Sequence, residues 1–209
     1  MYLGVLDKLW QRRHAHLGEL VRYCDDFVIL CRTAKACEEA EVRVREILRR
    51  LKLELHPEKT RRVELSRGRQ GFDFLGCHLR KRMSGPIWEK EHRRVYFLQR
   101  WPSQRSMTRV RHRVKELTGS NRNGVKDVRV LIRDINPVLH GWGNYFRTGN
   151  AAAKFNQIDT YVWRRLTHFM VRRHGRHLRA NDVEGWTSDF FHDHGLHRLR
   201  GTVQYPEAA

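Results

Sequence analysis

The stretch that decides the fold reads Leu20-Val-Arg-Tyr-Cys-Asp-Asp-Phe-Val-Ile-Leu-Cys-Arg32. Two short β-prone runs flank Cys24-Asp25-Asp26, a pattern typical of a β-hairpin with the aspartates at its tip. Asp-Asp is a favourable turn dipeptide in its own right. Paired carboxylates at a tight turn also suit hard divalent cations, which take oxygen ligands. Asp25 and Asp26 are therefore candidate metal ligands, with a plain turn as the alternative.

Periodicity predicts an α/β first half. Apolar residues at helical spacing predict a helix over about 35–52. Short β-prone runs predict strands at 53–56, 62–65, 72–79 and 94–98. The predicted fold class is accordingly α+β, with a sheet and a helix in the first half.

The second half is predicted to be helical from residue 103 onward. Apolar stripes predict three amphipathic helices, over about 107–117, 125–135 and 155–169. Pro137 is expected to bend or end the second helix, because proline has no N–H for the helical ladder. Asn150 is a candidate cap for the third helix.

The charge is strongly positive and unevenly distributed. The chain of 209 residues has 42 Lys and Arg against 23 Asp and Glu, a net charge of +19. Residues 101–180 hold 17 basic and 4 acidic side chains, whereas residues 181–209 hold 2 basic and 5 acidic ones. Arginine outnumbers lysine by 33 to 9, and arginine both forks phosphates and stacks on bases. Nucleic acid, and structured RNA in particular, is the expected partner.

Several other classes of protein are not indicated. No apolar run approaches the roughly 20 residues of a membrane span, and the N-terminus lacks a signal-peptide pattern. The four cysteines have no Cys-x-x-Cys spacing, so neither a disulfide framework nor a structural zinc site is expected. His192, His194 and His197 lie close together in sequence without a recognised ligand set. A cytoplasmic protein is the expectation.

The hairpin resembles the Tyr-x-Asp-Asp motif of reverse transcriptases encoded by bacterial group II introns, with Cys24 where alanine is usual. Three more blocks follow in the family's order, Leu53-Glu-Leu-His-Pro-Glu-Lys-Thr60, Gly71-Phe-Asp-Phe-Leu-Gly76 and Leu131-Ile-Arg-Asp-Ile-Asn-Pro-Val-Leu-His-Gly-Trp-Gly-Asn-Tyr-Phe-Arg147. They resemble a later palm motif, the primer grip and the core of the maturase-specific thumb. The resemblance covers nearly the whole chain.

The resemblance implies an architecture and a set of partners. It predicts the C-terminal part of a polymerase palm over 1–102, a helical thumb or maturase-specific domain over 103–180 and a tail over 181–209. It further implies RNA-directed DNA synthesis with primer-template and dNTP, binding of group II intron RNA during splicing, and Mg²⁺ as cofactor. No membrane partner is implied, and the oligomeric state is not indicated.

The resemblance also assigns site residues in the palm. Asp25 becomes a magnesium ligand supported by Asp26, and Lys59 would lie near the triphosphate. A solvated lysine after a turn is the alternative for Lys59. The primer-grip candidates are Phe74, Leu75 and Gly76. Phe74 and Leu75 are also typical of a strand core, which alternation favours for Phe74, whereas Gly76 would allow close backbone approach.

In the thumb, the candidate RNA-binding residues are Arg109, Arg113, Arg133, Trp142, Tyr145, Arg147, Lys154, Arg164 and Arg165. Trp142 and Tyr145 are also typical of a hydrophobic core. A solvated face is the usual explanation of a charge run. The scarcity of acidic residues between 101 and 180 favours a phosphate-binding surface.

One part of the family's active site has no counterpart in this sequence. The fingers and the palm strand with the other metal-binding aspartate lie upstream of the matched motifs in the family. Asp7 sits on a helix-like segment and is not a substitute. The chain by itself is therefore expected to lack polymerase activity, either as part of a reverse transcriptase/maturase or, alternatively, as a non-catalytic RNA-binding splicing cofactor.

Overall fold

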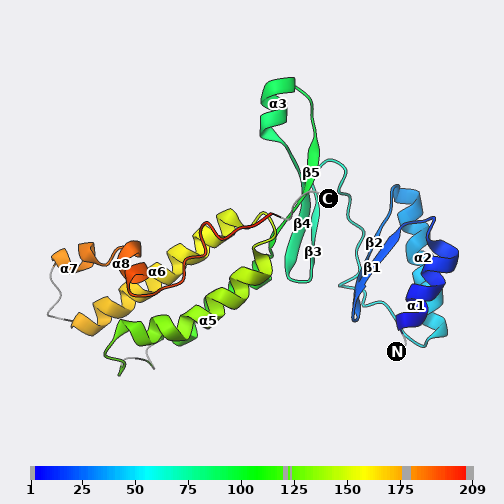
Figure 1. Ribbon diagram of the computed structural model, residues 1–209. Coiled ribbons are helices and arrows are strands. Elements are labelled where there is room, and N and C mark those ends of the chain that lie inside the picture. Colours follow the sequence, from blue (N-terminus) through cyan, green and yellow to red (C-terminus); the bar gives the residue numbers. More distant parts are fainter. Residues whose placement is uncertain (1–2, 120–121, 123, 176–179, 206–209) are drawn as a thin grey trace. The chain divides into compact units, whose positions relative to one another are not determined.

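A computed structural model describes residues 3–119, 122, 124–175 and 180–205 (Figure 1). The elements are α1 (Leu3–Leu9), the π-helix η1 (Trp10–His14), β1 (Glu19–Tyr23), β2 (Asp26–Leu30), α2 (Ala34–Arg50), β3 (Gly71–Phe74), β4 (Cys77–Met83), α3 (Gly85–Glu91), β5 (Tyr96–Pro102), α4 (Gln104–Leu117), α5 (Val128–Phe146), α6 (Ala152–His174), α7 (Ala180–Gly185) and α8 (Ser188–Asp193). Small sheets in the first half and helices in the second confirm the α+β class.

The chain divides into two compact units, each with a core of its own. The hairpin unit comprises residues 1–75 and 80–97, and the helical unit comprises residues 76–79 and 98–209. Two sheets are present among the described residues, one of β1 and β2 and one in the order β3-β4-β5.

The β1–β2 hairpin and α2 form as the sequence predicts. β1 and β2 pair antiparallel, with Leu20 opposite Ile29 and Tyr23 opposite Asp26. Thr33 caps α2 by accepting a hydrogen bond from the Ala36 amide at 3.1 Å. One face of α2 packs with Leu6, Trp10 and the inner face of the hairpin to form the core of this unit.

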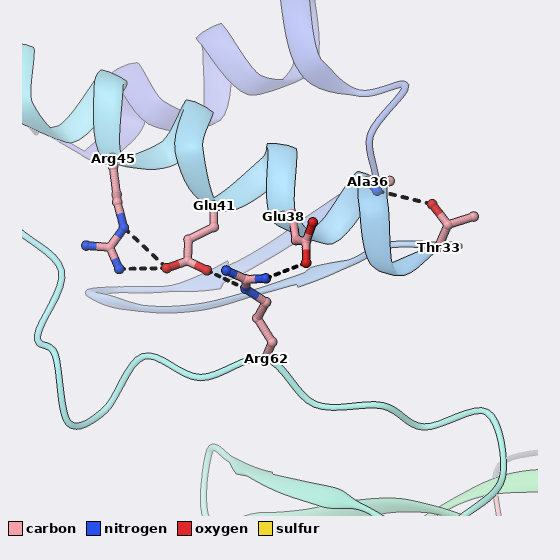
Figure 2. A network of polar contacts seen from close by, with 6 residues as sticks. All are labelled: Thr33, Ala36, Glu38, Glu41, Arg45 and Arg62. Carbon is pink, nitrogen blue, oxygen red and sulfur yellow. Dashed lines mark hydrogen bonds and ion pairs between the residues drawn. The ribbon is translucent and has the colours of Figure 1, made fainter.

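The strands predicted at 53–56 and 62–65 are wrong, because both segments are irregular. In the second segment Arg62 donates to Glu38 at 2.9 Å and to Glu41 at 2.7 Å, while Arg45 also donates to Glu41 at 2.6 Å (Figure 2). The hydrogen bond from Arg45, followed by the one from Arg62, is the main cause that lowers the pKa of the Glu41 carboxyl. A side-chain network on α2 thus holds a segment that has no strand partner.

The strand predicted at 72–79 is instead a hairpin. β3 and β4 are joined by the two residues Leu75 and Gly76, whose φ angles are 48° and 75°. Two successive positive φ angles are typical of a type I′ turn, which matches the twist of paired strands. Strand β5 begins two residues later than predicted, at Tyr96, and runs to Pro102.

The helical unit is a bundle of α4, α5 and α6 around one core. Pro137 does not end α5, which continues to Phe146. Ile132 and Ile135 before the proline and Leu139 after it are all buried, and this burial offsets the lost backbone bond. Asn150 is not the cap of α6. Instead, its side-chain oxygen accepts from the Arg100 amide at 3.2 Å.

The C-terminal segment, residues 186–203, packs into the same core. Trp186, Phe191, Leu196 and Leu199 are buried in it. A Cβ atom at Gly143 of α5 would lie 2.6 Å from a methyl carbon of Leu199, so a side chain there would force the buried Leu199 side chain to shift. Among the described residues, no helix is both long and apolar enough to cross a membrane.

Candidate metal hairpin and nucleic-acid interface

The aspartate pair lies at the tip of a very tight hairpin. Only Cys24 and Asp25 connect the two strands, and Cys24 has a φ of 54°. A residue with a side chain is strained at this positive φ, so neighbouring interactions must hold it. The guanidinium of Arg22 supplies one, because its Nη1 donates to the carbonyl oxygen of Cys24 at 2.6 Å.

Arg22 links this turn to α1. Its Nε donates to Asp7 Oδ1 at 2.8 Å, and its Nη2 also bonds to the other carboxylate oxygen of Asp7. The hydrogen bond from Arg22 is the main cause that lowers the pKa of Asp7. Asp7 thus lies on α1 as the partner of Arg22. The positioning role of Arg22 was missed from sequence, although strand alternation places it on the face opposite Tyr23.

The carboxylates of Asp25 and Asp26 are accessible to solvent. Both residues are exposed, and neither side chain has a hydrogen bond or ion pair with a described residue. Their oxygens are the ligand type that Mg²⁺ prefers, and exposure leaves room for its water ligands. Within the described ranges, however, no group of three or more His, Cys, Asp or Glu side chains is arranged for a metal. The residues present fit part of a magnesium site and fall short of a two-metal centre.

The other palm candidates occupy separate places. Lys59 is exposed in the irregular segment after α2, where its amide donates to the His56 carbonyl at 3.2 Å. Phe74 is half-buried in β3, and Leu75 and Gly76 form the turn that follows. The carbonyl of Gly76 accepts from the Ser103 amide at 2.9 Å and from Ser106 Oγ at 2.8 Å. These bonds fasten Gly76 to the start of α4, inside the helical unit.

The helical unit exposes arginines that lack acidic partners. Each is exposed, and none has a hydrogen bond or ion pair with a described side chain. These residues are Arg105 and Arg109 on α4, Arg133 on α5, and Arg164 and Arg173 on α6. Arg147 and Lys154 are half-buried and likewise lack an acidic partner in the described part of the chain. Unpaired guanidinium groups can bind phosphates without first breaking an internal salt bridge.

Two other arginine candidates are already engaged. Arg113 forms a salt bridge with Glu116 at 3.0 Å. Arg165 donates to Thr118 Oγ1 at 2.9 Å and to the Thr118 carbonyl at 3.1 Å, and Arg172 donates to the same carbonyl at 3.0 Å. Arg165 therefore satisfies groups at the C-terminus of α4, where cations complement the helix dipole.

The two aromatic candidates differ in exposure. Trp142 packs against Phe146 and Phe155, with ring centroids 5.0 and 5.5 Å away. The Trp142 indole N–H is buried and has no acceptor among the described residues. Tyr145, by contrast, is 59% exposed, with Phe146 edge-on at 4.7 Å. The surroundings of Trp142 favour a packing role, whereas Tyr145 presents a ring at the surface.

Two family models match the chain, one over its first part and one over its second part. Residues 1–79 match the model of the reverse transcriptase (RNA-dependent DNA polymerase) family, and residues 107–184 match that of the group II intron maturase-specific domain. A search of curated proteins finds no match. The first match includes the Asp25-Asp26 hairpin, and the second includes most of α4 and all of α5 and α6. The chain therefore belongs to the reverse transcriptase/maturase family encoded by group II introns.

Proposed function

We propose that this polypeptide binds group II intron RNA through its helical unit and assists intron splicing in the cytoplasm. The observation that carries the proposal is the set of exposed arginines on α4, α5 and α6 without acidic partners in the described residues. Arginine binds phosphate bidentately and stacks on unpaired bases, which suits folded RNA. The match to the maturase-specific domain supports the same partner.

The hairpin unit contributes the second half of the proposal. Asp25 and Asp26 would hold Mg²⁺ through their carboxylate oxygens, and Mg²⁺ in this family supplies charge stabilisation for phosphoryl transfer. Lys59 would face the dNTP, and the turn at Phe74, Leu75 and Gly76 would face the primer-template. DNA synthesis would need carboxylates in addition to this pair, so the RNA-binding role is the one that the 209-residue polypeptide performs alone.

Salt dependence of RNA binding tests the proposal. Binding of a group II intron RNA should weaken steeply as salt rises from about 50 to 200 mM, because each neutralised phosphate releases counterions. Arg109→Ala and Arg164→Ala should each reduce the slope of log affinity against log salt by about 1. Arg43→Ala is the matched control, since Arg43 is already paired with Glu39 and Glu46 in the hairpin unit. A flat salt response would contradict the proposal.

A further inference from the structure

A pocket of about 300 Å³ lies on the helical unit between α5 and the C-terminal segment. Arg129, Arg133, Pro137 and His140 line it from α5, and His194 and Gly195 line it from the opposite side. Their spacing of three or four residues places the α5 side chains along one helix face. The volume lies at the lower end of the range for small-ligand sites.

The wall of this pocket is fixed by side-chain bonds. Asn136 Nδ2 donates to the Gly195 carbonyl at 2.8 Å, and Asn136 Oδ1 accepts from the His197 amide at 2.9 Å. The rings of His140 and His197 stack with centroids 3.7 Å apart. The C-terminal segment is thereby held against α5, so the pocket is formed before any ligand binds.

The pocket combines an apolar floor with a cationic rim. Ile132 lines the pocket and is only 2% exposed, so its side chain forms the floor. The ring of Pro137 adds further apolar surface. Arg133 is exposed and has no acceptor in the described part of the chain, while Arg129 has Asp127 at 3.4 Å. A flat, partly apolar ligand with an attached negative charge matches this lining.

We propose that the pocket binds one unpaired nucleotide of the RNA held by the helical unit. The base lies against Ile132, Pro137 and the His140 ring, and the adjoining phosphates bind Arg129 and Arg133. Unpaired bases characteristically stack on histidine rings and on guanidinium planes, whereas a base inside a duplex cannot enter such a site. The inference rests on the proposed RNA binding and adds a preference for an unpaired base, which phosphate contacts alone do not provide.

Three RNAs distinguish base recognition from phosphate binding. The probes are a hairpin with a single-nucleotide bulge, the same hairpin with an abasic residue at the bulge, and an uninterrupted hairpin. The whole 209-residue chain should bind the bulged hairpin about tenfold more tightly than the other two. His140→Ala should remove this preference, because it takes away the ring against which the base lies. Arg109→Ala, which removes an exposed phosphate-binding arginine on α4, should weaken binding of all three RNAs equally.

A second measurement locates the base directly and does not depend on variants. A 4-thiouridine at the bulge should crosslink within residues 129–140 or 194–197, as mapped by mass spectrometry. Equal affinity for the three RNAs, parallel effects of the two variants, or crosslinks only elsewhere would overturn the pocket while leaving RNA binding intact. Failure to bind any of the RNAs would overturn the proposed function together with the pocket.

Discussion

Arg22 and Arg165 donate hydrogen bonds inside the fold, whereas Arg109 and Arg164 extend from it into solvent. The difference follows from the local supply of acceptors. Arg22 faces a carboxylate and the carbonyl of a strained turn, and Arg165 faces the unsatisfied carbonyl end of α4. A guanidinium with such partners stabilises the protein. One without them keeps its donors for a phosphate.

The neighbouring arginines Arg164 and Arg165 are predicted to separate binding from stability. Arg165→Ala should lower the free energy of unfolding by about 1–3 kcal/mol, because buried Thr118 loses hydrogen-bond donors. Arg164→Ala should change it by less than about 0.5 kcal/mol, yet should weaken RNA binding. Urea unfolding and RNA titration of both variants check the prediction. Equal loss of stability in the two would contradict it.

Arg22 and Asp7 are predicted to act as a coupled pair that supports the aspartate hairpin. A double-mutant cycle with Arg22→Ala and Asp7→Ala should give a favourable coupling that is measurable but modest, because both side chains are partly exposed. Since the pKa of Asp7 is lowered, this stability is present above its ordinary value of 3.8 and is lost as pH falls through the folded-state pKa. Arg32→Ala, an exposed arginine just after β2, is the control. A coupling near zero at pH 7 would count against the pair.

At the scale of elements, local patterns predicted α2 and the β1–β2 hairpin because both are defined by neighbours in sequence. The apolar stripe of α2 became its buried face, and the turn falls at Cys24 and Asp25, one residue shorter than predicted because Asp26 begins β2. The segment 62–65 failed because its apolar alternation has no partner strand, and Arg62 binds instead to glutamates more than twenty residues earlier. Long-range pairing of this kind leaves no periodic signal.

In the candidate site, too, local features were predictable from sequence and long-range contacts were not. Asp25 and Asp26 stand out by type and position, and the excess of basic residues marks the helical unit. Sequence could not separate Arg164 from Arg165, because the difference lies in the position of Thr118 across the bundle. It also hid the pocket on α5, since that site needs Asn136 to bind a segment about sixty residues later in the chain.

The C-terminal segment is predicted to loosen on acidification. Burial, and then the neighbouring His140, lower the pKa of His197, which also faces Asp159 of α6 and His192 of α8. The unfolded chain therefore takes up a proton more readily than the folded one as pH falls below the ordinary value of 6.5, and stability decreases. Burial raises the pKa of Asp159, so that group acts in the opposite direction above its ordinary value of 3.8.

Hydrogen exchange measures this loosening. The amides of Leu199 and Arg200, which donate to Asp159 at 3.1 and 2.8 Å, should exchange faster at about pH 5.5 than at about pH 7.5, after correction for intrinsic rates. His197→Phe keeps a ring beside His140 without a titrating group and should reduce the change. His168→Phe, at an exposed position on α6, should leave it as in the unaltered chain. An undiminished change in His197→Phe would contradict the assignment.

At the scale of the whole molecule, the two family matches coincide with two cores. The reverse transcriptase match covers the packing of α1, α2 and the hairpin, and the maturase match covers most of the helical bundle. The C-terminal segment lies beyond the second match and still supplies Phe191, Leu196 and Leu199 to that core. Removing residues 186–205 is therefore expected to destabilise the bundle as a whole.

The separate cores predict that RNA binding and nucleotidyl transfer can be tested independently in this polypeptide. On an RNA template with Mg²⁺, the 209-residue chain should give no primer extension, because Asp25 and Asp26 alone lack the bridging carboxylate that sets the spacing of two metals. Replacing both with asparagine should leave intron RNA affinity no weaker, since the exposed arginines of the helical unit are unchanged. A primer-extension assay and an RNA titration on the same preparations check both statements. Clear extension by the unaltered chain would show that its own residues complete the metal site, and loss of RNA affinity in the asparagine variant would place the hairpin in the RNA interface.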